Sequence, residues 1–408
     1  MQGRLAVIWA GPLLAGLGLL LWWVTRPGPP PAPVIPFDQM DYRPAPFTAL
    51  EGWEQDDHGA ALAAFLRSCD RIGTWPADRR LSGRDGIAGS AGDWTGVCRA
   101  AKTTLAAKPV MPDQARRFFE QYFRAVAVHY GGQAVGLFTG YYEPLLRGSR
   151  VRGGAYNVPL YGRPPDLVNV NLGDFSDSLK GQRIVGRIQG RQLRPYHERQ
   201  RIDAGVLAGK GLEILYVDDP VDAFFLQIQG SGRVRLANGK EIRLGYSEGN
   251  GRRYFAIGRE LIERGILTKE NVSMQSIRAW LSAHPTQARR VMDMNPSYIF
   301  FRELKGPGPI GALGVALSPG RSIAVDRQLI PLGIPVWLQT SHPAANPDQM
   351  EEPLRRLVLA QDTGGAIKGG VRGDLFWGHG ARAAAIAGRM KNTGQWFLLL
   401  PRALAERL

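Results

Sequence analysis

The feature that most constrains the fold is a stretch from Leu357 to Gly380, which reads LVLAQDTGGAIKGGVRGDLFWGHG. Its first four residues predict a buried strand, because a short apolar run is followed at once by glycines. Asp362 stands where this strand ends, a second strand-like piece covers residues 366–368, and Asp374 precedes another apolar run. Glycine permits sharp turns and a close approach of the backbone to a ligand. The stretch therefore predicts a turn-rich β structure that places two carboxylates within about one hairpin of each other.

The same arrangement occurs upstream. A strand-like run ends at Asp326, a Pro-Gly turn covers residues 330–333, and another strand covers 335–338. Aspartates at strand ends, together with Lys368 and the aromatic group around Trp377, suit an acid/base site for a polar polymer. The alternative is that these aspartates simply cap turns.

Longer motifs extend the pattern over most of the chain. AVDRQLIPLG, QDTGGAIKG and RGDLFWG follow one another in the last quarter, and FTGYYEP, FLQIQGSG and NPSYIFF begin at Phe138, Phe225 and Asn295. In this order the motifs resemble the membrane-bound lytic murein transglycosylase A family, with its three-aspartate barrel domain. The resemblance covers roughly residues 45 to 405.

The resemblance implies a mainly β fold with peripheral helices. A double-psi β-barrel domain would be built from residues 45–143 and 294–408, with a smaller β-barrel domain of residues 144–293 inserted and a groove between them. Periodicity predicts helices at 59–70, 113–129, 255–263, 272–283 and 381–390, and strands that include 138–142, 223–229 and a hairpin around Asn238-Gly239.

The family implies cleavage of the β-1,4 bond between N-acetylmuramic acid and N-acetylglucosamine without water, which yields a 1,6-anhydro sugar. Matched to the motif, Asp374 is the catalytic acid and then base, with Asp362 and Asp326 as orienting or electrostatic neighbours. Such an acid must hold its proton when substrate binds, which requires burial or a neighbouring carboxylate. Lys368 is expected on the substrate or on Asp362, because an ammonium group beside the acid would lower its pKa.

The expected glycan site draws on aromatic and polar side chains. Tyr141, Tyr142 and Trp377 offer flat faces for pyranose rings, although buried aromatic residues are equally common. Gln227 and Gln229, two apart on a predicted strand, would point to one face and read acetamido or hydroxyl groups. Free backbone amides are expected where that strand ends, at Ser231 and Gly232.

Composition and charge limit the kinds of binding partner that the chain is expected to have. A net charge of +15 indicates an anionic partner, which an acidic cell-wall glycan satisfies. Nucleic acid is not expected, because no recognised binding motif accompanies the scattered basic residues. No cofactor is implied, and no metal-ligand spacing is present. Cys69 and Cys98 are expected to form one disulfide in an exported protein, with two buried thiols as the alternative.

The N-terminus carries an apolar run from Leu5 to Val24, long enough to span a bilayer. Residues 1–26 are predicted to be an uncleaved signal anchor and the Pro-rich residues 27–44 a linker. No cysteine follows the run, which departs from the lipoproteins of the family. The expected location is the periplasm, anchored at the inner membrane; a cleaved signal peptide and a soluble periplasmic enzyme are the alternative.

Two other functions fit the same residues. A peptidoglycan hydrolase would need a second carboxylate such as Glu143 across the groove. A catalytically silent glycan-binding wall module would not depend on Asp374. An aspartic protease is disfavoured, because that class needs two aspartates sharing a proton and one DTG triplet is present. Membership of a wall-remodelling complex stays open.

Overall fold

A computed structural model describes residues 39–81, 83, 85–106, 112–306 and 308–408. The predicted signal anchor and most of the predicted linker lie outside these residues. Asp38–Leu408 forms one compact unit. Within the described part of the chain, no helix is long and apolar enough to cross a membrane.

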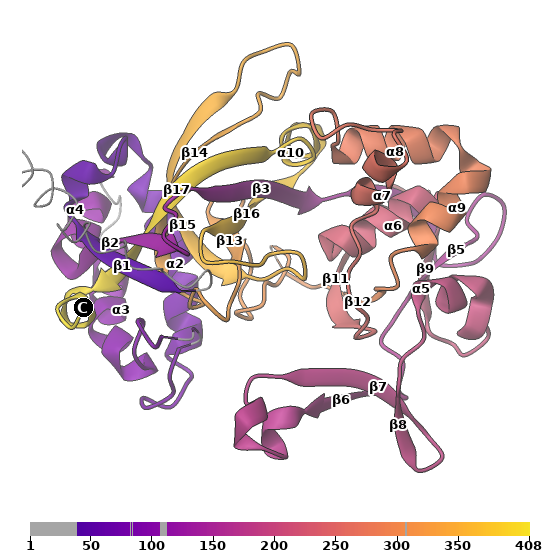
Figure 1. Cartoon of the computed structure of the whole chain (residues 1–408), viewed down its shortest axis with the longest axis horizontal. Coiled ribbons are helices and arrows are strands. Elements are labelled where there is room, and N and C mark those ends of the chain that lie inside the picture. Colours follow the sequence, from indigo (N-terminus) through magenta and orange to yellow (C-terminus); the bar gives the residue numbers. More distant parts are fainter. Residues whose placement is uncertain (1–38, 82, 84, 107–111, 307) are drawn as a thin grey trace, which may run out of the picture. The chain divides into compact units, whose positions relative to one another are not determined.

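The larger sheet closes on itself. Its strands follow the order β1-β2-β17-β14-β15-β13-β16-β3, and β17 also pairs with β3, so six strands form a ring (Figure 1). The pairs β13–β15 and β16–β3 are parallel, whereas the ring's other pairs are antiparallel. The strands of this sheet are β1 (Met40–Ala45), β2 (Phe123–Tyr130), β3 (Gly136–Glu143), β13 (Ser322–Val325), β14 (Pro335–His342), β15 (Glu352–Asp362), β16 (Arg372–His379) and β17 (Lys391–Pro401).

A second sheet lies in the middle of the sequence. Its strand order is β12-β11-β10-β4-β9-β5, and an isolated bridge between Gly162 and Phe301 joins the two edges. Its own apolar cluster includes Leu160, Leu215 and Leu244. The strands are β4 (Leu145–Ser149), β5 (Val158–Tyr161), β9 (Glu213–Val217), β10 (Ser231–Arg235), β11 (Glu241–Gly249) and β12 (Ile299–Glu303). The predicted combination of a barrel with a smaller inserted β domain is confirmed.

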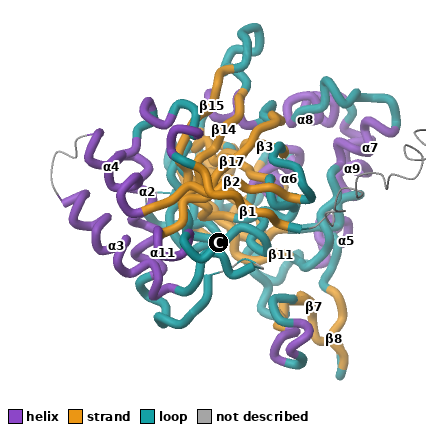
Figure 2. Tube along the Cα trace, turned by 60° about the vertical axis from the view of Figure 1, so that its left-hand side comes forward, coloured by secondary structure: helices purple, strands orange, loops and turns teal. Residues whose placement is uncertain are grey.

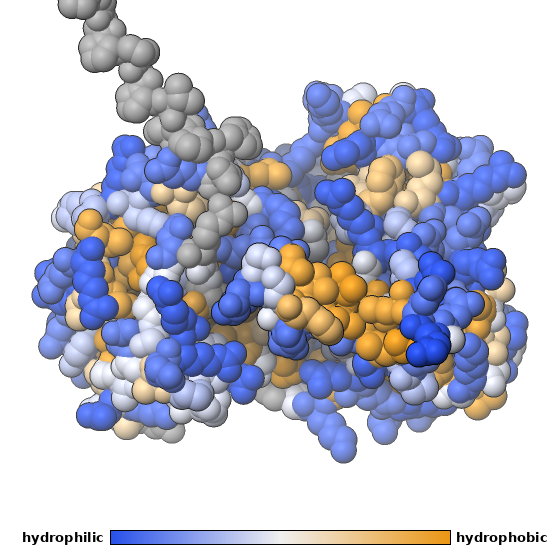
Figure 3. All heavy atoms as spheres, turned by 60° about the horizontal axis from the view of Figure 1, so that its bottom comes forward, coloured by the Kyte–Doolittle hydropathy of each residue, from blue (hydrophilic) through white to orange (hydrophobic). Residues whose placement is uncertain are grey.

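Three further strands form a small sheet of their own, which we call the flap: β6 (Leu167–Asn171), β7 (Arg183–Gln189) and β8 (Gln192–Pro195). The flap carries the exposed apolar side chains Ile184 and Ile188, and Phe175 is exposed in the connection between β6 and β7. One face of the molecule shows an apolar area bordered by hydrophilic side chains (Figure 3).

Helices cover the barrel and complete the second region (Figure 2). The barrel's helices are α2 (His58–Ile72), α3 (Ala91–Ala106), α4 (Pro112–Tyr122), α10 (Ala381–Ala387) and α11 (Arg402–Ala405). The others are α5 (Arg199–Arg201), α6 (Pro220–Gln229), α7 (Ile257–Glu263), α8 (Met274–Ala283) and α9 (Pro285–Asp293). Short 3₁₀ or π turns cover 47–49, 53–55, 172–174, 177–179 and 202–206.

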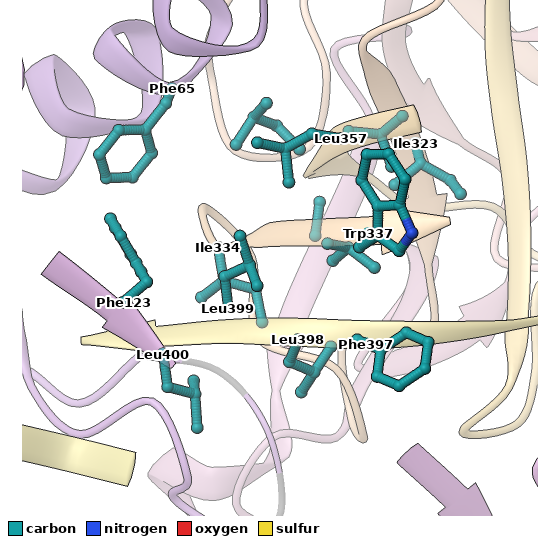
Figure 4. Packing of buried hydrophobic residues seen from close by; sticks show 14 of the residues in the cluster. Phe65, Phe123, Ile323, Ile334, Trp337, Leu357, Phe397, Leu398, Leu399 and Leu400 are labelled. Atoms are coloured by element: carbon teal, nitrogen blue, oxygen red, sulfur yellow. The ribbon is translucent and has the colours of Figure 1, made fainter. Parts of the chain in front are cut away.

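The main core joins the helices to the barrel. Phe65 of α2 and Phe123 of β2 lie with Ile334 and Leu399 in one apolar cluster (Figure 4). A disulfide between Cys69 and Cys98 links α2 to α3. In the chain-entropy model, closing a loop of this size contributes about 3–4 kcal/mol.

Several predicted elements are wrong. The predicted helix at 113–129 ends at Tyr122, and residues 123–130 form β2, whose alternating small and apolar residues suit a strand. The predicted strand at 223–229 belongs to helix α6, because Asp219 caps its start, Pro220 stands at its first position and Gly230 ends it in the left-handed conformation. Residues 366–368 are loop, and residues 40–44 of the predicted linker belong to β1.

A buried ion pair ties the N-terminal segment to the barrel. Both guanidinium Nη atoms of Arg321 donate to the carboxylate of Asp56, at 2.7 and 2.9 Å. The same carboxylate accepts the backbone N–H of Leu357 at 2.9 Å, and both charged side chains are at most 10% exposed. Removing one partner would leave the other buried and uncompensated.

We therefore expect Asp56→Ala to lower the free energy of unfolding by about 3–5 kcal/mol, because the Arg321 charge stays buried. The exposed pair of Lys102 and Asp70 provides the control, and Asp70→Ala should cost at most about 1 kcal/mol. Chemical denaturation followed by tryptophan fluorescence measures both. Equal losses in the two variants would contradict the importance of the buried pair.

Candidate active site

Asp374 lies within β16, and in the sheet register it pairs with Thr139 of the neighbouring strand β3 and Ala324 of the neighbouring strand β13. Its Oδ1 accepts a hydrogen bond of 2.6 Å from the Thr139 hydroxyl. The Thr139 oxygen in turn accepts a 2.9 Å bond from Arg372. The result is a chain of donors, Arg372 to Thr139 to Asp374, which fixes the orientation of a partly buried carboxyl group.

Asp362, at the end of β15, faces the same neighbourhood. Its Oδ2 accepts a hydrogen bond of 2.7 Å from the hydroxyl of Tyr141, which lies two residues after Thr139 on β3. Its Oδ1 accepts the backbone N–H of Ala312 at 2.9 Å. Thr139 and Tyr141 point to the same side of β3, because side chains alternate along a strand. One strand thus holds both aspartates.

The surroundings of Asp362 and Asp374 shift the pKa values of both carboxyl groups. Burial raises the pKa of Asp362, while the Tyr141 hydroxyl and the backbone amides of Thr363 and Ala312 oppose that rise. Burial is also the main cause of the raised pKa of Asp374; Arg372 and Thr139 oppose it, and the charge of Asp362 adds to it. Asp362 thus has more hydrogen-bond donors to its carboxylate than Asp374, and its negative charge favours the protonated form of Asp374.

Asp326 and Lys368 form a separate group. Asp326 accepts backbone N–H groups from Gln328 and Gly369, so it fixes the loop that follows Asp362. The Nζ of Lys368 lies 4.0 Å from Asp326 Oδ1, and its side chain is 66% exposed. The predicted neighbour of Lys368 within the protein was Asp362, and the structure places it beside Asp326 instead. Contact with substrate stays a prediction.

The predicted aromatic platforms lie mostly inside the protein. Tyr141 and Tyr142 are each 8% exposed, so neither offers an open face in the manner expected. Tyr142 packs against Ala383 and Ala387 of α10. Trp377 is partly buried, and its ring lies 4.8 Å from that of His342 in an edge-on contact. Tyr141 instead serves the site through its hydroxyl group.

The two glutamines occupy a helix rather than a strand, so the expected common face does not exist. Gln227 is 6% exposed within α6. Gln229, at the helix end, accepts the backbone N–H of Tyr142 through Oε1 at 3.0 Å. Gln229 therefore joins the inserted region to β3 at the residue after Tyr141, which donates to Asp362.

Ser231 and Gly232 begin strand β10 rather than end a preceding strand. They pair with Gly245 and Leu244 of β11, so the expectation of free strand-end amides was wrong. A Cβ atom added at Gly232 would lie 2.4 Å from Leu226 Cδ1, which explains why glycine occurs there. Its role in the structure is a close packing contact.

Glu143, the candidate second carboxylate, ends β3 and is 1% exposed. Its two oxygens lie 3.5 and 3.4 Å from the Nη2 atoms of Arg233 and Arg243, which belong to β10 and β11. It therefore acts as an ionic clamp between the barrel strand and the inserted sheet. A carboxylate enclosed in this way is poorly placed to activate water.

Sequence reasoning missed three participants: Thr139, Arg372 and the hydroxyl of Tyr141. Thr139 and Tyr141 stand in the FTGYYEP motif, and Arg372 stands in RGDLFWG, so their motifs were recognised but their roles were not. The signal that identifies them is alternation, which places Thr139 and Tyr141 on one side of the strand. Their partners depend on how the barrel closes.

Known proteins match both β regions of this chain. Residues 137–302 match the MltA specific insert domain, and residues 321–400 match the 3D domain. A crystal structure of membrane-bound lytic murein transglycosylase from Agrobacterium tumefaciens is 33% identical with a TM-score of 0.79, covering 90% of this chain and 99% of its own. The chain belongs to the membrane-bound lytic murein transglycosylase A family.

Other relatives extend the comparison within this family. The lytic murein transglycosylase A of Vibrio cholerae is 31% identical over 65% of this chain and 66% of its own length. The chain thus spans just under two thirds of that curated relative. An Escherichia coli structure of the family with bound chitohexaose is 27% identical, with a TM-score of 0.62, and covers 83% of this chain and 90% of its own.

The raised pKa of Asp374 predicts a pH-dependent stability difference from Asp374→Asn. Below the ordinary pKa of an aspartate, the carboxyl is neutral in both folded and unfolded states, and the two proteins should have similar unfolding free energies. As pH rises, the unfolded aspartate ionises first, so the wild type loses stability until the folded pKa is passed. The asparagine variant should become progressively the more stable protein.

Urea denaturation at a series of pH values measures this difference. Asp177→Asn is the control, because the Asp177 side chain is 90% exposed and should give no such trend. A pH-independent difference for Asp374→Asn would show that burial does not raise the pKa of this carboxyl group.

Proposed function

We propose that this chain is a lytic transglycosylase that cleaves the β-1,4 bond between N-acetylmuramic acid and N-acetylglucosamine in peptidoglycan. The observation that carries the proposal is the partly buried Asp374, whose pKa is raised by burial and by Asp362. A carboxyl group that keeps its proton can act as a general acid at a glycosidic bond. Family membership supplies the substrate class.

Asp374 carries both proton transfers. Its proton goes to the glycosidic oxygen as the C1–O bond breaks, which leaves Asp374 as a carboxylate. The carboxylate then takes the proton of the C6 hydroxyl while that oxygen bonds to C1. The product is a 1,6-anhydro-muramic acid end, no water is consumed, and Asp374 regains its proton.

Neighbouring groups assist each state of Asp374. The Thr139 hydroxyl donates 2.6 Å from Oδ1 and stabilises the carboxylate that forms after the first transfer. Before the first proton transfer, the negative charge of Asp362, which accepts a hydrogen bond from Tyr141, favours the protonated form of Asp374. The same charge stabilises the positive charge that develops at C1. Asp326 acts through the loop backbone at Gly369.

The two alternative functions have less support. The hydrolase needs a free second carboxylate, whereas Glu143 lies between Arg233 and Arg243. A silent binding module has no need of two buried carboxyls with raised pKa values, since each destabilises the fold at neutral pH.

We also propose that the enzyme works in the periplasm while held at the inner membrane by its N-terminal apolar run, Leu5 to Val24. The names of its relatives describe them as membrane-bound. An N-terminal anchor followed by a Pro-rich spacer would let the catalytic part reach glycan strands at a distance from the bilayer.

The proposal predicts the mass of the muropeptides released from purified peptidoglycan. The full chain should release products lighter by one water than those of a hydrolase, and Asp374→Asn should reduce release by at least about 10³-fold, because both proton transfers are lost. Mass spectrometry of the released fragments is the measurement, with Asp177→Asn as a control for surface charge.

A second variant separates the alternatives. Glu143→Gln should still give water-free products, although with less stable protein, because the clamp to Arg233 and Arg243 is lost. If the wild type gave products with one water added, and these disappeared in Glu143→Gln, the enzyme would be a hydrolase that uses two carboxylates. Binding without release by the wild type would indicate the silent module.

A further inference from the structure

A cavity of about 650 Å³ lies between the flap and strand β11 with the loop that follows it, and none of the three aspartates lines it. This is the size of a typical ligand pocket. Four arginines line it, Arg183 and Arg194 from the flap and Arg252 and Arg253 from the loop. Among the described residues that line it, Glu248 is the only acidic one. We call it the arginine pocket. Its charge is strongly unbalanced.

The single acid is already satisfied. Glu248 is 7% exposed and accepts hydrogen bonds from Asn169, Tyr246 and the backbone N–H of Gly249. Arg183 lies 3.3 Å from it and supplies its counter-charge. Glu248 therefore ties the flap to β11, and its charge is not free to neutralise the rest of the pocket.

Two arginines remain without a carboxylate. Arg252 lies 3.1 Å from Glu198, outside the pocket lining. For Arg194 and Arg253, by contrast, the described residues provide no ion-pair partner, and both residues are exposed. A guanidinium group presents paired donors that match a carboxylate in geometry. Two such groups facing one cavity suit a ligand with at least two carboxylates.

The walls add an apolar component. Ile184, Val185 and Leu193 of the flap line the same cavity. Apolar side chains beside cations are suited to an extended acidic peptide, whose small side chains they contact. Tyr246 and Ser297 also line the cavity, and the Tyr246 hydroxyl donates to Glu248.

The pocket is also close to the aspartates along the chain. Arg253 is followed by Tyr254, and a Cβ atom added at Gly365 would lie 4.0 Å from Tyr254 Cβ. Gly365 belongs to the loop directly after Asp362. Consecutive Cα atoms are about 3.8 Å apart, so the loop from Gly249 to Tyr254 runs from the arginine pocket to the edge of the candidate active site.

We propose that the arginine pocket binds the acidic peptide carried by the muramic acid of the substrate strand, with Arg194 and Arg253 on its carboxylates. This inference rests on the proposed function, since it assigns a second subsite to the same substrate. The pocket determines which strands are cleaved efficiently: those that still carry peptides. A glycan strand without peptides can still bind at Asp374, but it makes no contact with the arginine pocket.

The test compares kcat/KM on peptide-bearing murein strands with kcat/KM on the same strands after an amidase has removed the peptides. The wild-type full chain should favour the peptide-bearing strands about tenfold, which corresponds to about 1.4 kcal/mol. In the double variant Arg194→Gln/Arg253→Gln this ratio should fall toward one. Added salt should also lower it, because exposed charge pairs are screened.

The matched control is Arg191→Gln/Arg201→Gln, which removes the same charge from exposed arginines outside the pocket lining. Its ratio should stay at the wild-type value. A wild-type ratio of one, or equal ratios in the wild type and the Arg194/Arg253 variant, would overturn the peptide site.

A direct binding titration separates this inference from the proposed function. If neither strand is cleaved, the proposed function fails, and calorimetry with the amidase-released peptide still decides the pocket's role. Binding to the wild type that is lost in the Arg194→Gln/Arg253→Gln variant supports the inference. The inference is contradicted if the wild type does not bind the peptide. It is also contradicted if the wild type binds vesicles of anionic phospholipid instead and the Arg194→Gln/Arg253→Gln variant does not.

Discussion

Closure of the barrel by β3 is the interaction on which the rest of the structure depends. This strand comes from the first part of the chain, yet it pairs in parallel with β16 and antiparallel with β17 near the C-terminus. The approach is close: a Cβ atom added at Gly136 would lie 1.7 Å from the carbonyl oxygen of Val371, so only glycine fits there. Because of this pairing, Thr139 reaches Asp374 and Tyr141 reaches Asp362.

The same strand couples the two β regions. Its last residue, Glu143, is enclosed by arginines of β10 and β11, and the backbone of Tyr142 is bonded to Gln229 of α6. The strand that orients the acids thus continues directly into the inserted region, which also holds the arginine pocket. A displacement of the inserted region would be transmitted to the hydroxyl groups that hold Asp362 and Asp374.

Sequence reasoning identified the aspartates because their signals are local. A short apolar run followed by Asp and glycines predicts a strand end, and Asp362 is the last residue of β15 while Asp326 directly follows β13. The hydrogen bonds that set their chemistry are not local, since Tyr141 and Asp362 are 221 residues apart in the chain. No pattern within one segment predicts such a pair without knowledge of the sheet order.

The failures have physical causes as well. The run that contains Gln227 and Gln229 is apolar enough for a buried strand or a buried helix, and the cap residues Asp219, Pro220 and Gly230 decide for the helix. Aromatic residues serve cores and binding sites equally well, so the sequence alone predicts sugar platforms at Tyr141 and Tyr142, which are buried. The platform role of Trp377, which is partly buried, stays a prediction. Burial, which a sequence does not reveal residue by residue, distinguishes the two uses.

The central claim is that Asp374 works as a protonated acid, because burial raises its pKa by more than Arg372 and the Thr139 hydrogen bond lower it. The most direct measurement is the pH dependence of kcat/KM on peptidoglycan for the wild type, Thr139→Val and Thr139→Ser. Activity should fall on the alkaline side as Asp374 loses its proton. Thr139→Val should shift that fall to higher pH, because the hydrogen bond that stabilises the carboxylate is gone; Thr139→Ser, which keeps the hydroxyl, should not. An alkaline limb at the ordinary pKa of an aspartate, or one that all three proteins share, would contradict the account.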